Sequence, residues 1–224
     1  MAKSKRVRIT TPKGIAKFPR LSSPDTKFNP DGEYRVTLLL DPEKDKEFLD
    51  ELDAMADAAV QKAQEENKKY RKVMQRQEPY KMELDQDGEE TGKVEVKFKM
   101  RAHVKSKDGK EYSFAPALFD AQGKPIDPAK INIGGGSIIR VNFTPNPYFV
   151  AATKAVGISL QLNAVQVLEL VQYNGGDAAS FGFEQEEGFS VDDIDSTVDD
   201  NDDFTDDADD DSDTAEDDIT EEDF

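Results

Sequence analysis

A stretch of twelve residues, VEVKFKMRAHVK at positions 94–105, alternates strictly between apolar and polar side chains. A period of two is typical of a β-strand with one buried face. The polar face of this strand would carry Glu95, Lys97, Lys99, Arg101, His103 and Lys105. Because alternate residues of a strand lie about 6.6 Å apart, these bases predict a dense line of positive charge that suits an extended polyanion.

Aromatic residues follow this line in the sequence. Asp108 and Gly109 predict a turn, and the segment 111–119 then returns as a second strand with Tyr112 and Phe114 on one face. Basic side chains interleaved with aromatic rings indicate sequence-tolerant binding of single-stranded nucleic acid, because the positive charges follow the phosphates while the rings stack on the nucleobases. The alternative is a solvated strand face, with Tyr112 or Phe114 in the core.

Several other chemistries are excluded or lack a signal. The chain has no cysteine and one histidine, so thiolate metal sites, cysteine nucleophiles and histidine clusters are excluded. The run Gly134 to Gly136 is not followed by the Gly-Lys-Ser/Thr of a phosphate loop. No pair of carboxylates is marked for acid–base catalysis. We therefore expect a non-enzymatic protein without catalytic residues, metal or cofactor.

Charge divides the chain into two parts. Of 48 acidic residues, 23 lie in 174–224, a segment without Lys or Arg, whereas residues 1–173 hold 25 acids and all 29 bases. The body is thus mildly basic at about +4. The acidic segment has too few apolar residues to offset the entropy of ordering. We predict a folded domain over 1–173 and a disordered acidic tail over 174–224.

The elements that must position the basic strand can also be outlined. Residues 33–40 predict an earlier strand, and residues 138–144 and 158–171 predict later ones. Asp41 and Pro42 mark a helix start, and apolar residues then recur with a helical period up to about residue 77. Several strands and one helix predict a small α+β or β-barrel domain. No apolar run approaches the ~20 residues of a membrane span, and no secretory signal begins the sequence, so we expect a cytoplasmic location and no membrane partner.

Short motifs in a fixed order give a further indication. They are FNPDGEYRV at 28–36, DPEKD at 41–45, IGGGS at 133–137, PY at 147–148, VGISLQL at 156–162, VQVLEL at 165–170 and a final EEDF. Together they resemble the single-stranded DNA-binding proteins of short-tailed bacteriophages. The resemblance implies a mainly β OB-fold, a five-stranded barrel with an α-helix inserted at about 42–77.

The resemblance also implies roles for individual residues. DNA contact would fall on Lys3, Arg35, the bases Lys97 to Lys105, Tyr112 and Tyr148, with Phe149 in place of a tryptophan that relatives can use. The acidic tail would cover the DNA groove and, through Asp223 and Phe224, recruit the phage DNA polymerase and helicase-primase. Annealing of complementary strands in phage replication and recombination is a further expectation from the family. The sequence leaves the oligomeric state open, and a homodimer held partly through the tails is the arrangement considered.

Two other functions remain open at this point. An acidic-tailed chaperone or nucleic-acid mimic would grip basic proteins with its tail, but it would have no use for a line of bases on its body. A nuclease would need aspartates that hold metals at fixed spacing, whereas the clustered aspartates here lie in a segment that is not expected to fold.

Overall fold

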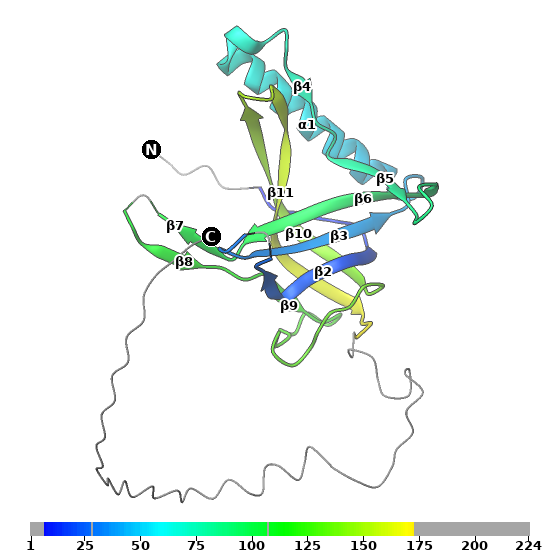
Figure 1. Ribbon diagram of the computed structural model, residues 1–224. Coiled ribbons are helices and arrows are strands. Elements are labelled where there is room, and N and C mark those ends of the chain that lie inside the picture. Colours follow the sequence, from blue (N-terminus) through cyan, green and yellow to red (C-terminus); the bar gives the residue numbers. More distant parts are fainter. Residues whose placement is uncertain (1–6, 28, 107, 173–224) are drawn as a thin grey trace, which may run out of the picture. The chain divides into compact units, whose positions relative to one another are not determined.

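The computed structural model describes residues 7–27, 29–106 and 108–172, and β-strands dominate this part of the chain (Figure 1). Lys3 and the predicted acidic tail, with Asp223 and Phe224, lie outside the described residues. The strands are β1 (Ile9–Thr10), β2 (Gly14–Asp25), β3 (Glu33–Leu40), β4 (Gln75–Arg76), β5 (Tyr80–Leu84), β6 (Glu90–Arg101), β7 (His103–Lys105), β8 (Glu111–Ser113), β9 (Ala117–Phe119), β10 (Ile138–Val150) and β11 (Ala155–Glu169). The helical elements are α1 (Lys46–Glu66) and the short 3₁₀ helix η1 (Lys68–Tyr70).

Five strands close into a ring. β2, β3 and β6 form an antiparallel meander, and β10 and β11 form a long hairpin that is paired from Ile138 to Val150. Two short seams join these halves: β2 meets β10 at two residue pairs, and β6 meets β11 at the single pair Lys99 and Gln161. This cyclic order confirms the mainly β, OB-type barrel that the family resemblance implies.

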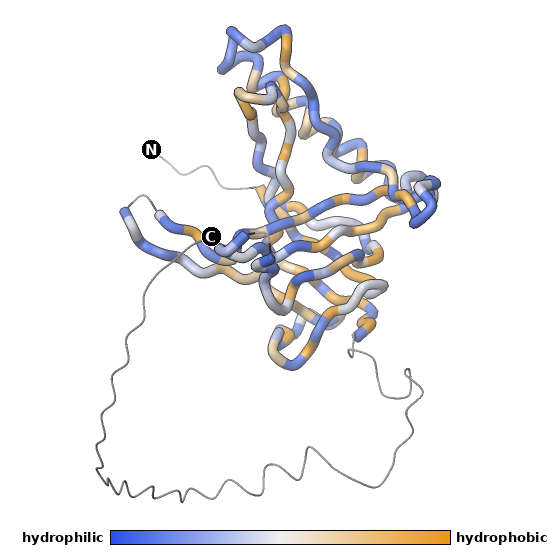
Figure 2. Tube along the Cα trace, in the orientation of Figure 1, coloured by the Kyte–Doolittle hydropathy of each residue, from blue (hydrophilic) through white to orange (hydrophobic). Residues whose placement is uncertain are grey.

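The barrel interior is filled by the inward positions of these strands. Apolar and polar residues alternate along β6 from Val94 to Arg101, and every second residue of β3 from Val36 to Leu40 is buried; Figure 2 shows both strands with apolar and polar residues mixed. Phe98 and Phe143 are both fully buried, and their ring centroids lie 5.2 Å apart. Gly14 pairs with Ile139 of β10, and on its other side a Cβ would lie 2.6 Å from the carbonyl oxygen of Leu39, so the close approach of β2 to β3 there requires glycine.

The helix predicted over 42–77 is shorter in the structure. Residues 42–45 form a turn, because the carboxylate of Asp41 accepts hydrogen bonds from the amides of Glu43 and Lys44. At the other end, both the backbone and side-chain N–H groups of Asn67 donate to the carbonyl of Ala63 and end α1. The apolar residues that recur with a helical period do form one buried face of α1, which packs against β10 and β11.

Two predicted strands are interrupted, and four strands, β1, β2, β4 and β5, were not predicted. The strand over 94–105 breaks at Ala102, whose N–H turns to the carbonyl of Gly32, so that His103 and Lys105 belong to the separate hairpin β7–β8. The segment 111–119 divides around Pro116, and β9 then joins β11. β2 was missed because Pro19 and Pro24 indicate breaks, yet both prolines lie within the strand.

Candidate nucleic-acid interface

The basic face of β6 forms the centre of the candidate site. Lys97, Lys99 and Arg101 are exposed, whereas Val96 and Phe98, which alternate with them, are fully buried and Met100 is partly buried. Strand pleating therefore turns three cations outward at alternate positions, as the sequence predicts. Glu95, at the start of this row, is an exception, because it is buried and bound to lysines.

Neighbouring strands extend this charge across the sheet. Arg35 on β3 is paired with Lys99, and Arg20 on β2 is paired in turn with Arg35. Because directly paired residues share a face, Arg20, Arg35 and Lys99 form a transverse row that crosses the line along β6. Arg20 was not among the predicted site residues, because its strand was not recognised from the sequence.

Three surface hollows meet at Lys99 and together form what we call the basic groove. The first is lined by residues of β2, β3 and β6, including Phe18 and Arg35. The second includes Arg101 and Phe114. The third brings Lys97, Lys99 and Arg101 together with Tyr148 of the β10–β11 hairpin. Three cations of one strand thus lie beside rings from three other segments.

The position of the Tyr148 ring depends on the glycine paired with it across the hairpin. It is paired across the hairpin with Gly157, and a Cβ on this glycine would lie 3.0 Å from the Tyr148 hydroxyl oxygen. The ring therefore lies across bare backbone and reaches the groove. Phe149 points the other way, as strand alternation requires, and packs on Tyr70 with ring centroids 5.6 Å apart. The structure thus separates Phe149 from the other predicted DNA contacts.

Phe114 lines the second hollow of the groove, and Tyr112 lies beside it on β8. Their rings are stacked with centroids 6.4 Å apart, and both side chains are about half exposed. His103, beside them on β7, is exposed and shares a hydrogen bond with the hydroxyl of Ser113. Lys105 reaches Glu111 across the same hairpin at 3.3 Å. These predicted contacts therefore stand on a two-stranded arm next to the barrel.

Carboxylates balance part of the positive charge in the groove. Arg35 is bound to Asp25 at 2.6 Å, and Lys99 lies 3.7 Å from Glu33. The backbone N–H of Lys27, aided by Arg35, holds the pKa of Asp25 below its ordinary value. Among the described residues, no ion pair involves Lys97 or Arg101. These two cations are the most available for phosphates.

A buried ionic cluster supports the edge of the groove. The Lys17 ammonium lies 2.7 Å from Glu83 and 2.9 Å from Glu95. The hydrogen bond from Lys17 lowers the pKa of Glu83, and for Glu95 the bonds from Lys17 and Lys81 outweigh burial, which alone would raise its pKa. Lys17 is thus a structural cation, held by carboxylates and not available to DNA.

The described residues contain neither a metal-binding cluster nor a helix that could span a membrane. No group of three or more His, Asp or Glu side chains there is arranged to hold a metal ion. No helix in the same ranges has the length and apolar character needed to cross a bilayer.

Comparison with known families agrees with this geometry. Residues 13–170 match the family described as "Single-stranded DNA-binding protein, Bacteriophage T7". The chain belongs to this family. The match covers the whole barrel and the groove, and it confirms the family resemblance that the short motifs indicate. Members of the family are binding proteins and not enzymes.

Individual relatives support the assignment. The single-stranded DNA-binding protein of Enterobacteria phage T3 is 30% identical over 168 residues, which cover 71% of this chain and 72% of the relative. The protein of the same name from Escherichia phage T7 is 29% identical over 157 residues, covering 66% of this chain and 67% of the relative. The crystal structure of gp2.5 of bacteriophage T7 has a TM-score of 0.64 at 24% identity, with 84% of this chain and 100% of that chain covered, and it shows the same fold.

Proposed function

We propose that this phage single-stranded DNA-binding protein holds the DNA strand in the basic groove without regard to sequence. The observation that carries the proposal is the meeting of three hollows at Lys99, which sets cations of β6 beside Phe18, Tyr148 and Phe114. Phosphates would lie along Lys97, Lys99 and Arg101. Bases would face the rings, where each stack contributes ~1–3 kcal/mol whatever the base.

Single-strand preference follows from the site. The rings offer flat faces to bases, and a base within a duplex is already stacked on its neighbours and cannot reach them. Duplex DNA would meet only the cations. The proposed site residues are those predicted from the sequence, with Phe149 now the weakest candidate because it packs on Tyr70.

The acidic segment 174–224 has a separate proposed role. It carries 23 acids and no Lys or Arg, and it is tethered to the domain that bears the groove. A tethered polyanion acts at high effective concentration, so it should compete with DNA for the groove. We further propose that this segment, through Asp223 and Phe224, recruits the phage DNA polymerase and helicase-primase in the host cytoplasm. Strand annealing belongs to the same proposal and rests on the family resemblance. A homodimer held partly through the tails also belongs to it and rests on the sequence of the acidic segment alone.

Fluorescence anisotropy with labelled oligo-dT and a matched duplex tests the groove. The full chain should prefer oligo-dT, and a chain that ends at Gly176 should bind it more tightly than the full chain. Reversing the three cations (Lys97→Glu, Lys99→Glu and Arg101→Glu) should abolish binding. The matched control reverses three exposed lysines of the α1 region (Lys44→Glu, Lys46→Glu and Lys62→Glu) and should bind nearly as the parent does. Equal losses in both variants would refute the groove.

A further inference from the structure

An irregularity in β2 places an aromatic ring in the groove that was not among the site residues predicted from the sequence. Lys17 is paired with Thr37 and Arg20 with Arg35, so three steps along β2 correspond to two steps along β3. The extra residue is a β-bulge, and Phe18 within it has a φ of 51°. A left-handed backbone is unfavourable for an aromatic residue and calls for an explanation.

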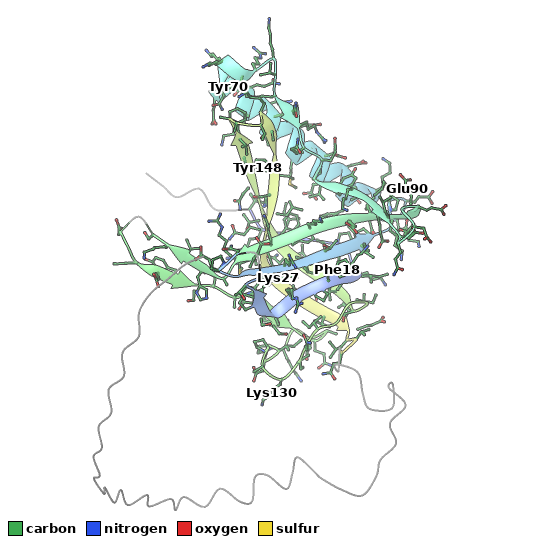
Figure 3. All side chains as sticks on the ribbon, viewed as in Figure 1. Phe18, Lys27, Tyr70, Glu90, Lys130 and Tyr148 are labelled. Atoms are coloured by element: carbon green, nitrogen blue, oxygen red, sulfur yellow. The ribbon has the colours of Figure 1, made fainter. Side chains whose placement is uncertain are left out.

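The bulge decides which way Phe18 points. Ala16 and Leu21 are buried, whereas Arg20 is exposed. With strict alternation Phe18 would follow Ala16 into the core. The extra residue turns it outward instead, and at 73% exposure it is the most exposed large apolar side chain among the described residues (Figure 3).

Contacts of the preceding residue hold this conformation in place. Lys17, directly before Phe18, is fixed by Glu83 and Glu95, and Glu83 also accepts a hydrogen bond from the Thr91 hydroxyl at 2.7 Å. The Lys17 ammonium lies 5.6 Å from the centroid of the Phe18 ring. The backbone next to Phe18 is therefore held in place while its ring is exposed to solvent, an arrangement that suits binding of a flat ligand.

The surroundings of the ring identify the chemistry of that ligand. Phe18 lines the same hollow as Arg35, Lys97 and Lys99, and Arg20 is paired with Arg35 on the exposed side. A group that fits must offer a flat apolar face to the ring and negative charge to the cations around it. The nucleobase and phosphate of a single DNA strand meet both needs.

We propose that Phe18 is a base-stacking platform, and that the DNA path continues from the β6 cations across β3 onto β2, with Arg20 and Arg35 at the phosphates. This inference rests on the proposed function and adds a subsite to it. It also gives the bulge a role, because a regular β2 would bury the ring and leave this end of the groove without a stacking partner.

Substitutions at Phe18 in the full chain test the platform. Phe18→Ala and Phe18→Leu should weaken binding of oligo-dT on the order of tenfold, whereas Phe18→Tyr, which keeps the ring, should bind as the parent does. Val171→Ala, at another exposed apolar residue that lines none of the three hollows, is the matched control. An abasic oligomer keeps the phosphates and lacks bases, so Phe18→Ala should leave its binding unchanged.

A spectroscopic readout separates stacking from indirect effects. The chain has no tryptophan, so Phe18→Trp introduces a single reporter, and oligo-dT should quench its emission while Val171→Trp stays unquenched. The platform is overturned if Phe18→Trp is not quenched, or if Phe18→Ala binds oligo-dT as tightly as the parent. The platform is also overturned if Phe18→Ala lowers the affinity for the abasic oligomer as much as the affinity for oligo-dT. If reversal of Lys97, Lys99 and Arg101 abolishes binding in the same assay, only the platform fails and the proposed function stands.

Discussion

Neutralising the β6 cations should change the salt dependence of DNA binding by a calculable amount. The variant replaces Lys97, Lys99 and Arg101 by glutamine in the full chain. Each cation that neutralises a phosphate releases counterions, and for single strands each such contact adds about −0.7 to the slope of log K against log salt. Three lost contacts should therefore make the slope about 2 units flatter. Lys99 should contribute somewhat less to the slope than Lys97 or Arg101, because Glu33, 3.7 Å away, already balances part of its charge.

This slope can be measured by titrating labelled oligo-dT at several salt concentrations between about 50 and 200 mM. Over that range the parent should lose about 20 times more affinity than the triple variant. The control neutralises Lys44, Lys46 and Lys62 and should keep the parent slope. A triple variant with the parent slope, or a control that flattens equally, would refute phosphate contact along β6.

Three further predictions concern the supports of the groove. Gly157→Ala should push the Tyr148 ring aside, because its Cβ would lie 3.0 Å from the hydroxyl oxygen; oligo-dT affinity should fall, with little further loss when Tyr148→Ala is added. Phe18→Gly removes the unfavourable left-handed backbone, so the free energy of unfolding in urea should stay the same or rise by up to ~1 kcal/mol while DNA affinity falls; a clear loss of stability would contradict this. Lys17 holds the pKa of Glu83 below its ordinary 4.5, so this pair stabilises the fold above about pH 4.5 and the contribution is lost as the pH falls through the lowered pKa. Lys17→Met should therefore flatten the decline of the melting temperature between pH 5 and pH 3, and an unchanged decline would count against the pair.

The centre of the site could be predicted from local sequence. Alternation along residues 94–105 is a period that pleating enforces, so the exposure of Lys97, Lys99 and Arg101 follows from the pattern alone. The same rule, applied to the PY motif, would have separated Tyr148 from Phe149. The helix bounds were less accurate, because side-chain hydrogen bonds end the helical period early: Asp41 holds residues 42–45 in a turn, and Asn67 binds the carbonyl of Ala63.

The remaining features depend on distant parts of the chain. The Phe18 bulge shows only when β2 is paired with β3, and Pro19 beside it makes the strand itself hard to recognise. The carboxylates that balance the groove, such as Glu33 beside Lys99, come from another strand, so no local window could assign them.

The short seams of the barrel imply that DNA binding affects how firmly its two halves are held together. The β2–β3–β6 meander and the β10–β11 hairpin are each extensively paired within themselves, yet β6 meets β11 at one residue pair, Lys99 and Gln161. The proposed DNA path crosses this seam, with cations on the meander and Tyr148 on the hairpin. A bound DNA strand would therefore contact both halves of the barrel across this seam. The barrel should resist separation of the two halves more strongly with DNA bound than without it.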